Sequence, residues 1–302
     1  MGLSVSVVVP SYQGKNRLLK LLHALEAQET ACDWEVVVIL DGSNDGSAEL
    51  LQAWTSRLNL RYVARPHNLG RSATLNEGFA YATKQVLVRC DDDLEPASNY
   101  VAEFSRVLTE NPNAGVVGLY KNNYPPTPYS KAYGEIVDRR FAREAYLDSA
   151  DHRWHYWAGN CAVTRQTYDE VGGYDLGFRQ YGWEDVDWGY RLAQLGHPVL
   201  LWEPLETTHN VAATTTAGRC ERARWSGVAS IKFYNKHQIQ PKTADPNAWN
   251  RLVSFCTPFA GKGLGASVDK VLPLLSARLA LRLVDLAVQS AFKRGVRDAK
   301  RH

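Results

Sequence analysis

The segment VLVRCDDDLEP at residues 86–96 joins a short apolar stretch directly to three consecutive aspartates. Two other stretches have the same form, since Ser4–Val9 is followed by Pro10-Ser11-Tyr12 and Trp34–Leu40 by Asp41-Gly42-Ser43. Unbroken runs of β-branched and apolar residues are typical of strands buried on both faces of a parallel sheet. The sequence therefore predicts a sheet whose strands end in polar residues.

Helix-like and strand-like segments alternate along the first two-thirds of the chain. The predicted strands are Ser4–Val9, Trp34–Leu40, Leu60–Ala64, Gln85–Arg89 and Ala114–Leu119. The predicted helices are Asn16–Ala27, Ser47–Leu58, Ser72–Thr83, Tyr100–Thr109, Gln166–Val171 and Trp183–Leu195. This alternation predicts an α/β fold with a mostly parallel sheet flanked by helices on both faces. The pattern is interrupted from about Asn122 to Trp157, where Tyr124–Tyr129 predicts a stiff aromatic loop.

The composition places the chain among globular proteins. Its 302 residues are 45% hydrophobic and 22% charged, which excludes a fully disordered chain, a collagen-like repeat and a disulfide scaffold. The five cysteines are widely spaced and form no CxxC pair, so we expect free thiols in a reducing, cytoplasmic compartment. The first residues lack the basic region of a secretory signal, and no run of apolar residues is long enough to predict a membrane span.

The formal net charge of +3 hides an uneven distribution. Residues 1–218 contain 19 basic and 27 acidic side chains, a net −8, whereas residues 219–302 contain 16 basic and 5 acidic ones, a net +11. A basic C-terminal part indicates an anionic partner. A nucleic acid as that partner would leave the clustered aspartates without a role, so no nucleic acid is expected.

The three adjacent carboxylates after the strand Gln85–Arg89 repel one another unless a cation neutralises them. Because side chains two residues apart in an extended segment point the same way, we expect Asp91 and Asp93 to share one site. Carboxylate oxygens suit Mn²⁺ or Mg²⁺, and such an ion often shares its coordination with substrate phosphates. In open parallel sheets, ligands bind beyond the carboxyl ends of the strands, where these aspartates fall. The alternative is a solvated acidic turn.

A second acidic cluster, Trp183-Glu184-Asp185-Val186-Asp187, follows a stretch rich in glycine and aromatic residues. A carboxylate at a helix start stabilises the helix dipole, which explains one acid but leaves the aromatic neighbours unexplained. The functional alternative is a general base that takes the proton from a hydroxyl group.

Five elements, in order along the chain, together resemble family 2 inverting glycosyltransferases of the GT-A fold, which use a nucleotide-diphospho-sugar. They cover roughly residues 4–210 and read VSVVVPSYQGKNRLLKLLHAL, VVVILDGSNDGS, NLGRSATLNEGFAYA, VLVRCDDDLEP and GGYDLGFRQYGWEDVDWGYRLAQLG. The last element is also similar to galactosyl- and N-acetylgalactosaminyl-transferases in its Gly-Trp-Glu-Asp segment. The resemblance implies a GT-A fold, in which a Rossmann-like, mostly parallel sheet carries the donor site.

The resemblance also implies which residues bind the nucleotide. Asp41 matches the aspartate that hydrogen-bonds the base, usually uracil, and Arg71 matches a residue near the base or diphosphate. Asp91 and Asp92 match residues on the ribose or nucleotide side. The nucleotide-binding candidates are Pro10, Ser11, Tyr12, Asp41, Arg71, Asp91 and Asp92.

Further matches concern the metal and the transfer step. The DxD motif and a downstream histidine imply Mn²⁺ or Mg²⁺ bound by Asp93, Asp91 and His209. Asp185 matches the catalytic base, and Glu184 matches a residue that binds acceptor or donor-sugar hydroxyls. Aromatic rings and amides suit sugar rings, so the candidates for the sugar pocket are Gly159, Asn160 and Trp183.

Together these matches imply that a sugar passes from a UDP-sugar to an acceptor hydroxyl in one displacement that inverts the anomeric centre. The acceptor is a carbohydrate, a lipid-linked intermediate or a small molecule. One alternative is a nucleotide-sugar or carbohydrate-binding protein without catalysis. Another is a sugar nucleotidyltransferase, although PSYQGKN is a poor match for its phosphate loop.

The chain is expected to contain a catalytic domain over residues 1–217, with its nucleotide-sugar half ending near residue 120, and a basic, mainly helical region over residues 218–302. Arg219, Arg222 and Arg224 predict either a flap over the diphosphate or a solvated basic helix. From residue 267, apolar residues recur at helical spacing beside basic ones. Such a helix suits peripheral contact with the inner face of a membrane, packing on the catalytic domain, or a homodimer.

Overall fold

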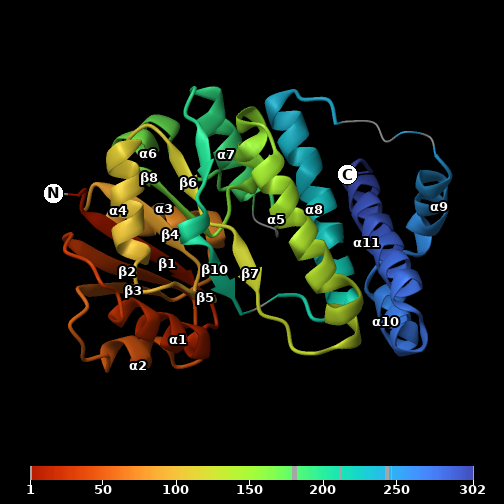
Figure 1. The fold of residues 1–302 in the computed structure, drawn as a ribbon, viewed down its shortest axis with the longest axis horizontal. Coiled ribbons are helices and arrows are strands. Elements are labelled where there is room, and N and C mark those ends of the chain that lie inside the picture. Colours follow the sequence, from red (N-terminus) through yellow and green to blue (C-terminus); the bar gives the residue numbers. More distant parts are fainter. Residues whose placement is uncertain (1, 179–181, 211, 242–244, 246, 302) are drawn as a thin grey trace. The chain divides into compact units, whose positions relative to one another are not determined.

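The computed structural model describes residues 2–178, 182–210, 212–241, 245 and 247–301. Its main element is a seven-stranded sheet (Figure 1). In spatial order the strands are β3 Leu60–Arg65, β2 Trp34–Asp41, β1 Val5–Ser11, β4 Val86–Cys90, β8 Asn160–Thr164, β6 Gly115–Val117 and β9 Val199–Leu201. A second sheet consists of β5 Leu94–Glu95, β10 Thr207–His209 and β7 Tyr120–Asn122.

Most neighbouring strands of the seven-stranded sheet run parallel. β1 pairs in parallel with β2 and with β4, and β2 pairs in the same way with β3. β8 is the exception, because it runs antiparallel to β4 and to β6. The predicted α/β fold with a mostly parallel sheet is therefore confirmed. Since β8 runs in the opposite direction, its first residue, Asn160, lies opposite Cys90 at the end of β4.

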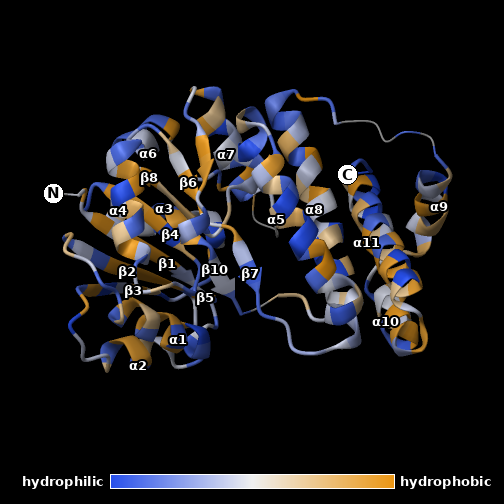
Figure 2. Ribbon diagram, in the orientation of Figure 1, coloured by the Kyte–Doolittle hydropathy of each residue, from blue (hydrophilic) through white to orange (hydrophobic). Residues whose placement is uncertain are grey.

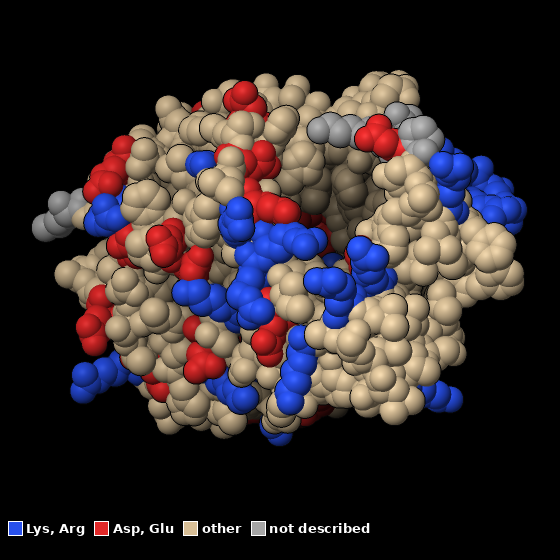
Figure 3. Space-filling view, turned by 45° about the vertical axis from the view of Figure 1, so that its right-hand side comes forward, with Lys and Arg blue, Asp and Glu red and all other residues tan. Residues whose placement is uncertain are grey.

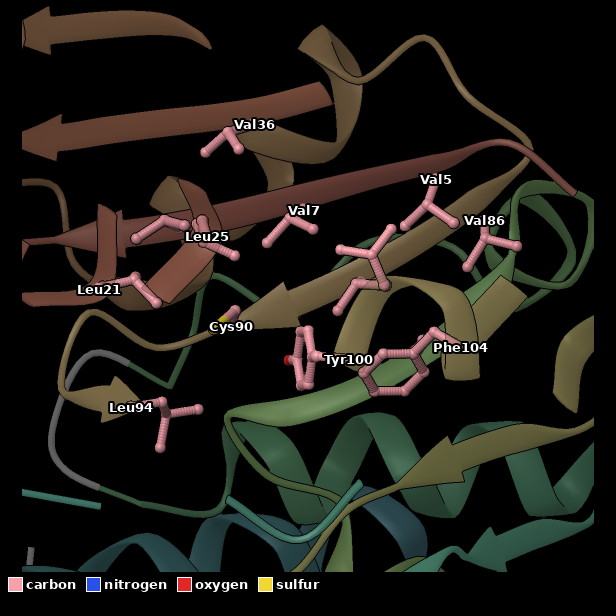
Figure 4. Close-up of a cluster of buried hydrophobic side chains, with 14 of the residues drawn as sticks. Val5, Val7, Leu21, Leu25, Val36, Val86, Cys90, Leu94, Tyr100 and Phe104 are labelled. Atoms are coloured by element: carbon pink, nitrogen blue, oxygen red, sulfur yellow. The ribbon is translucent and has the colours of Figure 1, made fainter. Parts of the chain in front are cut away.

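Helices cover both faces of this sheet, and each face has its own hydrophobic core. On one face, Val5 and Val7 pack with residues of α1 and α4 (Figure 4). On the other face, Val8 packs with residues of α3 and α7. Alternate residues of β1 thus point to opposite buried faces, which explains why both faces of the strand carry valines, with Ser6 as a buried polar residue that donates to Glu35 of β2 (Figure 2). The helices around the sheet are α1 Lys15–Glu26, α2 Ser47–Gln52, α3 Arg71–Tyr81, α4 Tyr100–Glu110, α6 Arg165–Val171 and α7 Glu184–Gln194.

By its internal contacts the chain forms two compact units. Unit 1 comprises residues 1–121, 142–179 and 184–210, and it contains the seven-stranded sheet. Unit 2 comprises residues 122–141, 180–183 and 211–302, and its described part is mainly helical. The predicted limit at residue 217, between a catalytic domain and a basic helical region, falls within the first turn of α8 Thr216–His237, and this division stays a prediction.

The interruption predicted from Asn122 to Trp157 is wrong for its middle part, which forms the helix α5 Glu135–Leu147. The π-helix η1, Ser130–Gly134, leads into α5, and the 3-10 helix η2, Ala150–Tyr156, follows it. Among the residues of α5, Ala145 alone is buried. Val137, Phe141 and Ala145 nevertheless recur every four residues, a spacing typical of a helix that the prediction did not use.

Unit 2 is built around α8 and α11 Ala277–Ala299, which cross at close range. A Cβ atom on Gly295 would lie 1.9 Å from the carbonyl oxygen of Arg224, so this position requires glycine. Apolar residues of the predicted C-terminal stripe, such as Val284 and Val288, are buried in the core of this unit. The stripe is therefore used in packing within unit 2.

The continuous helix predicted from residue 267 onward is wrong. α10 Lys262–Val271 ends in the 3-10 turn η5, Leu272–Leu274, and the chain becomes helical again at Ala277. Pro273 breaks the helix because proline has no N–H to donate and clashes with the preceding turn. In the part of the chain that is described, no helix combines the length and the apolar character needed to span a bilayer.

The arginines near residue 220 belong to a regular helix. Arg219, Arg222 and Arg224 all lie in α8. Arg224 forms an ion pair with Asp298 of α11, with 2.7 Å between Nη2 and Oδ2. Of the two predicted alternatives, the structure thus favours the basic helix over the flap.

Candidate active site

The ends of β1, β2 and β4 lie together at one edge of the sheet because these strands are parallel neighbours in register. This register brings Ser11, Asp41 and the three aspartates after β4 to the same edge, as predicted from the strand ends. The reversed strand β8 begins at this edge with Asn160. The candidate site is therefore built by strand ends and by the loops that follow them.

The three consecutive aspartates face three different sets of partners. Residues 91–93 form a turn, closed by a hydrogen bond from the Leu94 N–H to the Asp91 carbonyl. The extended geometry had predicted that Asp91 and Asp93 share one site. In the turn they have separate partners instead. In a turn, side chains two positions apart no longer point the same way, which is the reason for the difference.

Asp92 ties this turn to the end of β1. Its carboxylate accepts a hydrogen bond from Ser11 Oγ at 2.6 Å and two from the guanidinium of Arg17, at 2.9 and 3.1 Å. Burial raises the pKa of Asp92, and the bonds from Arg17 and Ser11 oppose that shift. The residue thus has a clear structural role, and its contact with a nucleotide stays a prediction.

Asp93 pairs with His209, with 3.2 Å between Oδ2 and Nε2. The pairing of β10 with β5 places His209 opposite Leu94, which is next to Asp93. The ring of Tyr120 stacks on His209 with 5.0 Å between centroids. Burial acts to raise the pKa of Asp93, but the hydrogen bond from His209 and the nearby Arg17 and Arg71 together outweigh it, so the net effect lowers this pKa and favours the charged carboxylate.

An oxygen and a nitrogen at this distance fit a divalent cation that takes its remaining ligands from elsewhere. Among the described residues, no group of three or more His, Cys, Asp or Glu side chains is arranged to hold a metal ion. The third predicted ligand, Asp91, has both carboxylate oxygens engaged by Arg89, at 2.8 and 3.1 Å. Asp93 and His209 would supply an oxygen and a nitrogen ligand to an ion such as Mn²⁺.

Arg89 links Asp91 to the predicted base, Asp185. It lies on β4, its side chain is 1% exposed, and it donates hydrogen bonds to both carboxylates. Burial acts to lower the pKa of Arg89, but the two carboxylates outweigh it and raise this pKa. Asp185 lies in the first turn of α7, where burial raises its pKa to about 6 against the opposing effect of Arg89.

Glu184 precedes Asp185 and has one carboxylate oxygen that is unpaired. Its Oε1 accepts a hydrogen bond from Arg71 at 3.1 Å. Its Oε2 is buried and has no hydrogen-bond partner in the structure. A buried carboxylate oxygen without a protein partner is costly, so this oxygen is open to a hydrogen bond from a bound water or ligand.

Asp41 holds the loop before α3. It is 3% exposed and accepts hydrogen bonds from the backbone N–H groups of Leu69 at 2.8 Å and Gly70 at 2.9 Å. It also pairs with Arg65 at 3.1 Å. These contacts fix the start of α3, on which Arg71 is the first residue, and the predicted contact of Asp41 with a base stays a prediction.

Asn160 holds neighbouring segments of the candidate site together through hydrogen bonds of its side chain. Its side chain is fully buried, accepts from the Tyr100 hydroxyl at 2.8 Å, and donates to the carbonyls of Gly118 and Leu205. Because both amide hydrogens are engaged inside the protein, the predicted contact of Asn160 with a sugar is replaced by a supporting role. Gly159 lies against the turn, since a Cβ atom there would come within 2.2 Å of Asp91 Oδ2.

Trp183 contacts residues of α8, which the sequence did not predict. Its indole N–H donates to Ser226 Oγ at 3.0 Å, and its ring packs against Phe233 and Tyr234. Its φ of 72° is in the left-handed region, which is rare for a bulky residue and common at functional sites. The predicted contact of Trp183 with a sugar stays a prediction, and residues 179–181 of the same motif lie outside the described part of the chain.

Arg89 and Arg17 were not among the predicted site residues, although the sequence carried a signal for Arg89. Arg89 interrupts the apolar run Val86–Cys90, and a buried arginine requires anionic partners nearby. Arg17 lies on the exposed side of an amphipathic helix, where a basic residue carries no signal. Tyr12 and Pro10, which were predicted to surround a nucleoside, lie at the end of β1, and the Tyr12 side chain is half exposed.

Two sequence models of known protein families match the chain. The sequence model of "Glycosyl transferase family 2" matches residues 6–172. The chain belongs to glycosyl transferase family 2. A second model, described as "N-terminal domain of galactosyltransferase", matches residues 139–212, which include the Trp-Glu-Asp segment. The predicted family is thereby confirmed.

The chain is similar in sequence to several named proteins. It is 27% identical to validoxylamine A glucosyltransferase of Streptomyces hygroscopicus subsp. jinggangensis over 72% of this chain and 60% of the relative. It is 26% identical to the chondroitin synthase of Pasteurella multocida over 64% of this chain and 23% of that protein. The chain thus matches less than two-thirds of the length of these relatives.

Solved structures share the fold. The mannosyltransferase PcManGT from Pyrobaculum calidifontis, in complex with GDP-Man and Mn²⁺, superposes with a TM-score of 0.66 and 17% identity over 97% of this chain and 87% of that one. GalNAc-T7 with UDP, GalNAc and Mn²⁺ superposes with a TM-score of 0.54 and 18% identity over 78% of this chain and 51% of the other. These likenesses confirm the GT-A fold predicted for this family 2 member.

Proposed function

We propose that the protein is a metal-dependent inverting glycosyltransferase that moves a sugar from a UDP-sugar to an acceptor hydroxyl. The observation that carries this proposal is the connection from Asp185 through Arg89 to Asp91, two residues before the Asp93–His209 pair. A candidate base and a candidate metal pair are thus brought close to the same strand end, that of β4, within unit 1. A protein that only binds nucleotide sugars has no need of such a base.

In the transfer step, Asp185 accepts the proton of the acceptor hydroxyl as that oxygen attacks the anomeric carbon. Asp93 and His209 would hold the metal ion, which when bound neutralises the charge that develops on the leaving diphosphate. Arg89 keeps the Asp185 carboxylate in place. The free Oε2 of Glu184 accepts a hydrogen bond from a sugar or acceptor hydroxyl.

The choice of UDP and of the acceptor rests on relatives. GalNAc-T7 and TarS of S. aureus form complexes with UDP or UDP-GlcNAc, whereas PcManGT binds GDP-Man. The names of sequence relatives include a polysaccharide synthase, an undecaprenyl-phosphate sugar transferase and the glucosyltransferase of validoxylamine A. We therefore propose UDP as the nucleotide and a carbohydrate, lipid-linked or small-molecule hydroxyl as the acceptor.

The test is a panel of UDP- and GDP-sugars, first in a thermal-shift assay with Mn²⁺ and then in an assay for release of the nucleoside diphosphate. We expect one UDP-sugar to raise the melting temperature most and to be turned over. The Asp185→Asn variant should bind the same donor and release no nucleotide above background. Binding by the wild-type protein without turnover of any donor would favour the alternative, a binding protein without catalysis.

A further inference from the structure

An exposed apolar stripe runs along α9 Ala248–Cys256 and the 3-10 turn η4, Thr257–Phe259, that continues it. Leu252, Phe255 and Phe259 are 42%, 73% and 70% exposed. Steps of three and four residues place them on one side of a helical segment. Two phenylalanines exposed to this extent leave a large apolar area in water, and such patches mark interaction sites.

The opposite side of α9 is anchored in unit 2. Val253 is buried, and its carbonyl accepts a hydrogen bond from Ser290 Oγ of α11 at 3.3 Å. The indole of Trp249 donates to Gln289 at 3.0 Å. α9 thus has one face that is packed on α11 and one apolar face that remains exposed.

Basic side chains border this stripe. Lys293 donates to Ser254 Oγ at 2.6 Å, the residue before Phe255 in the chain, and Arg294 donates to the carbonyl of Ala260, the residue after Phe259. Over residues 248–301 the sequence has ten basic and three acidic side chains. On the right-hand part of the face in Figure 3, basic side chains accompany broad uncharged areas, and acidic ones are few.

The three acidic residues of this segment bind partners inside unit 2. Asp269 accepts from the backbone N–H groups of Thr216 and Ala217, and Asp298 pairs with Arg224. Asp285 accepts from Gln289. The acids are therefore used within the fold, and the segment as a whole is cationic.

We propose that the α9 stripe docks onto an anionic lipid surface. Phe255 and Phe259 enter the boundary between headgroups and acyl chains, while Lys293 and Arg294 face the lipid phosphates. A second copy of the chain fits this surface poorly, because two faces with the same positive charge repel each other. Side chains that protrude so far suit a fluid bilayer, which requires no shaped pocket. The contact differs from the one predicted from the sequence, whose apolar stripe from residue 267 onward contributes several side chains, such as Val268, Val284 and Val288, to the core of unit 2.

The test is co-sedimentation of the full chain with phosphatidylcholine vesicles, with and without about one-third phosphatidylglycerol. We expect binding to the anionic vesicles to be at least about tenfold stronger than to the neutral ones. The double variant Phe255→Ser/Phe259→Ser should lose at least about tenfold in binding to the anionic vesicles. Leu147→Ser is the matched control, because Leu147 is also highly exposed, at 75%, and lies outside the segment.

Unchanged melting temperatures would show that the variants are folded. The proposal would be overturned if the wild-type protein failed to bind anionic vesicles. It would also be overturned if the double variant bound them as strongly as the wild type. Self-association that depends on Phe255 and Phe259 in the absence of vesicle binding would assign the stripe to a dimer and would also overturn it. None of these measurements requires sugar transfer, so the outcome is independent of the proposed activity.

Discussion

Replacing Arg89 with methionine tests whether the candidate site is also part of what keeps the protein folded. The Arg89 side chain is 1% exposed and bonds to Asp91 and Asp185, so its loss leaves two carboxylates without their counter-charge. Removing one partner of a buried ion pair costs about 3–5 kcal/mol. We therefore expect Arg89→Met to lower the free energy of unfolding by about 3–5 kcal/mol at pH 8.

Urea denaturation followed by tryptophan fluorescence measures this change. The control is Arg106→Met, because Arg106 also bridges two carboxylates, those of Glu103 and Glu110, but its side chain is 47% exposed. Surface ion pairs of this kind contribute little to stability. The loss of stability should therefore be much smaller in the control.

The pH dependence gives a second check. Burial already raises the pKa of Asp185 to about 6, and Arg89 acts to lower it. Without Arg89 the pKa of Asp185 rises further, so the folded variant binds a proton that the folded wild type has released. The stability of the variant relative to the wild type must then fall as the pH rises from 5 to 8. Equal losses in Arg89→Met and Arg106→Met, or a loss that does not change with pH, would refute the reasoning.

Four further predictions concern activity and packing. Asp185→Asn should lower transfer by about 10²–10⁴-fold with unchanged donor affinity, and in the wild type kcat should rise with pH through about 6 because the base must be deprotonated. A pH-independent kcat would argue against this base. Excess EDTA should abolish transfer, and Asp93→Asn or His209→Ala should raise the Mn²⁺ concentration needed for half-maximal activity by about tenfold or more. Full activity in EDTA would remove the metal from the mechanism. Glu184→Gln should weaken binding of the UDP-sugar and leave binding of UDP unchanged in calorimetry, since its free oxygen is assigned to a sugar or acceptor hydroxyl. Gly295→Leu should destabilise the protein by about 1–3 kcal/mol or more in thermal unfolding, because a Cβ atom would collide with the carbonyl of Arg224.

The sheet could be predicted from the sequence because its central strands β1, β2 and β4 are buried on both faces. In β1, Val5, Val7 and Val8 each enter a core, and Ser6 is a single small polar residue that leaves the apolar run recognisable. The helix α5 carries the helical signal in a weaker form, because Val137, Phe141 and Ala145 recur every four residues but Ala145 alone is buried. This spacing was available in the sequence and was not used.

The sequence was sufficient to predict the residues of the candidate site as a group. It was not sufficient to predict which side chains they contact. Asp91, Asp92 and Asp93 stand at a strand end in the sequence, and the sheet places them at the predicted edge. Their partners depend on the turn that follows β4 and on segments more than 70 residues away in the chain, such as Arg17 and His209. Sequence spacing alone carries no information about such contacts.

The turn at residues 91–93 has a consequence for how this sequence can change. Each of the three aspartates has its own partner set, and a substitution at one position disturbs one of them. Inserting or deleting a single residue would instead shift all three side chains to the wrong neighbours at once. Natural and engineered variants of this protein should therefore tolerate a single substitution in the turn far better than an insertion or a deletion.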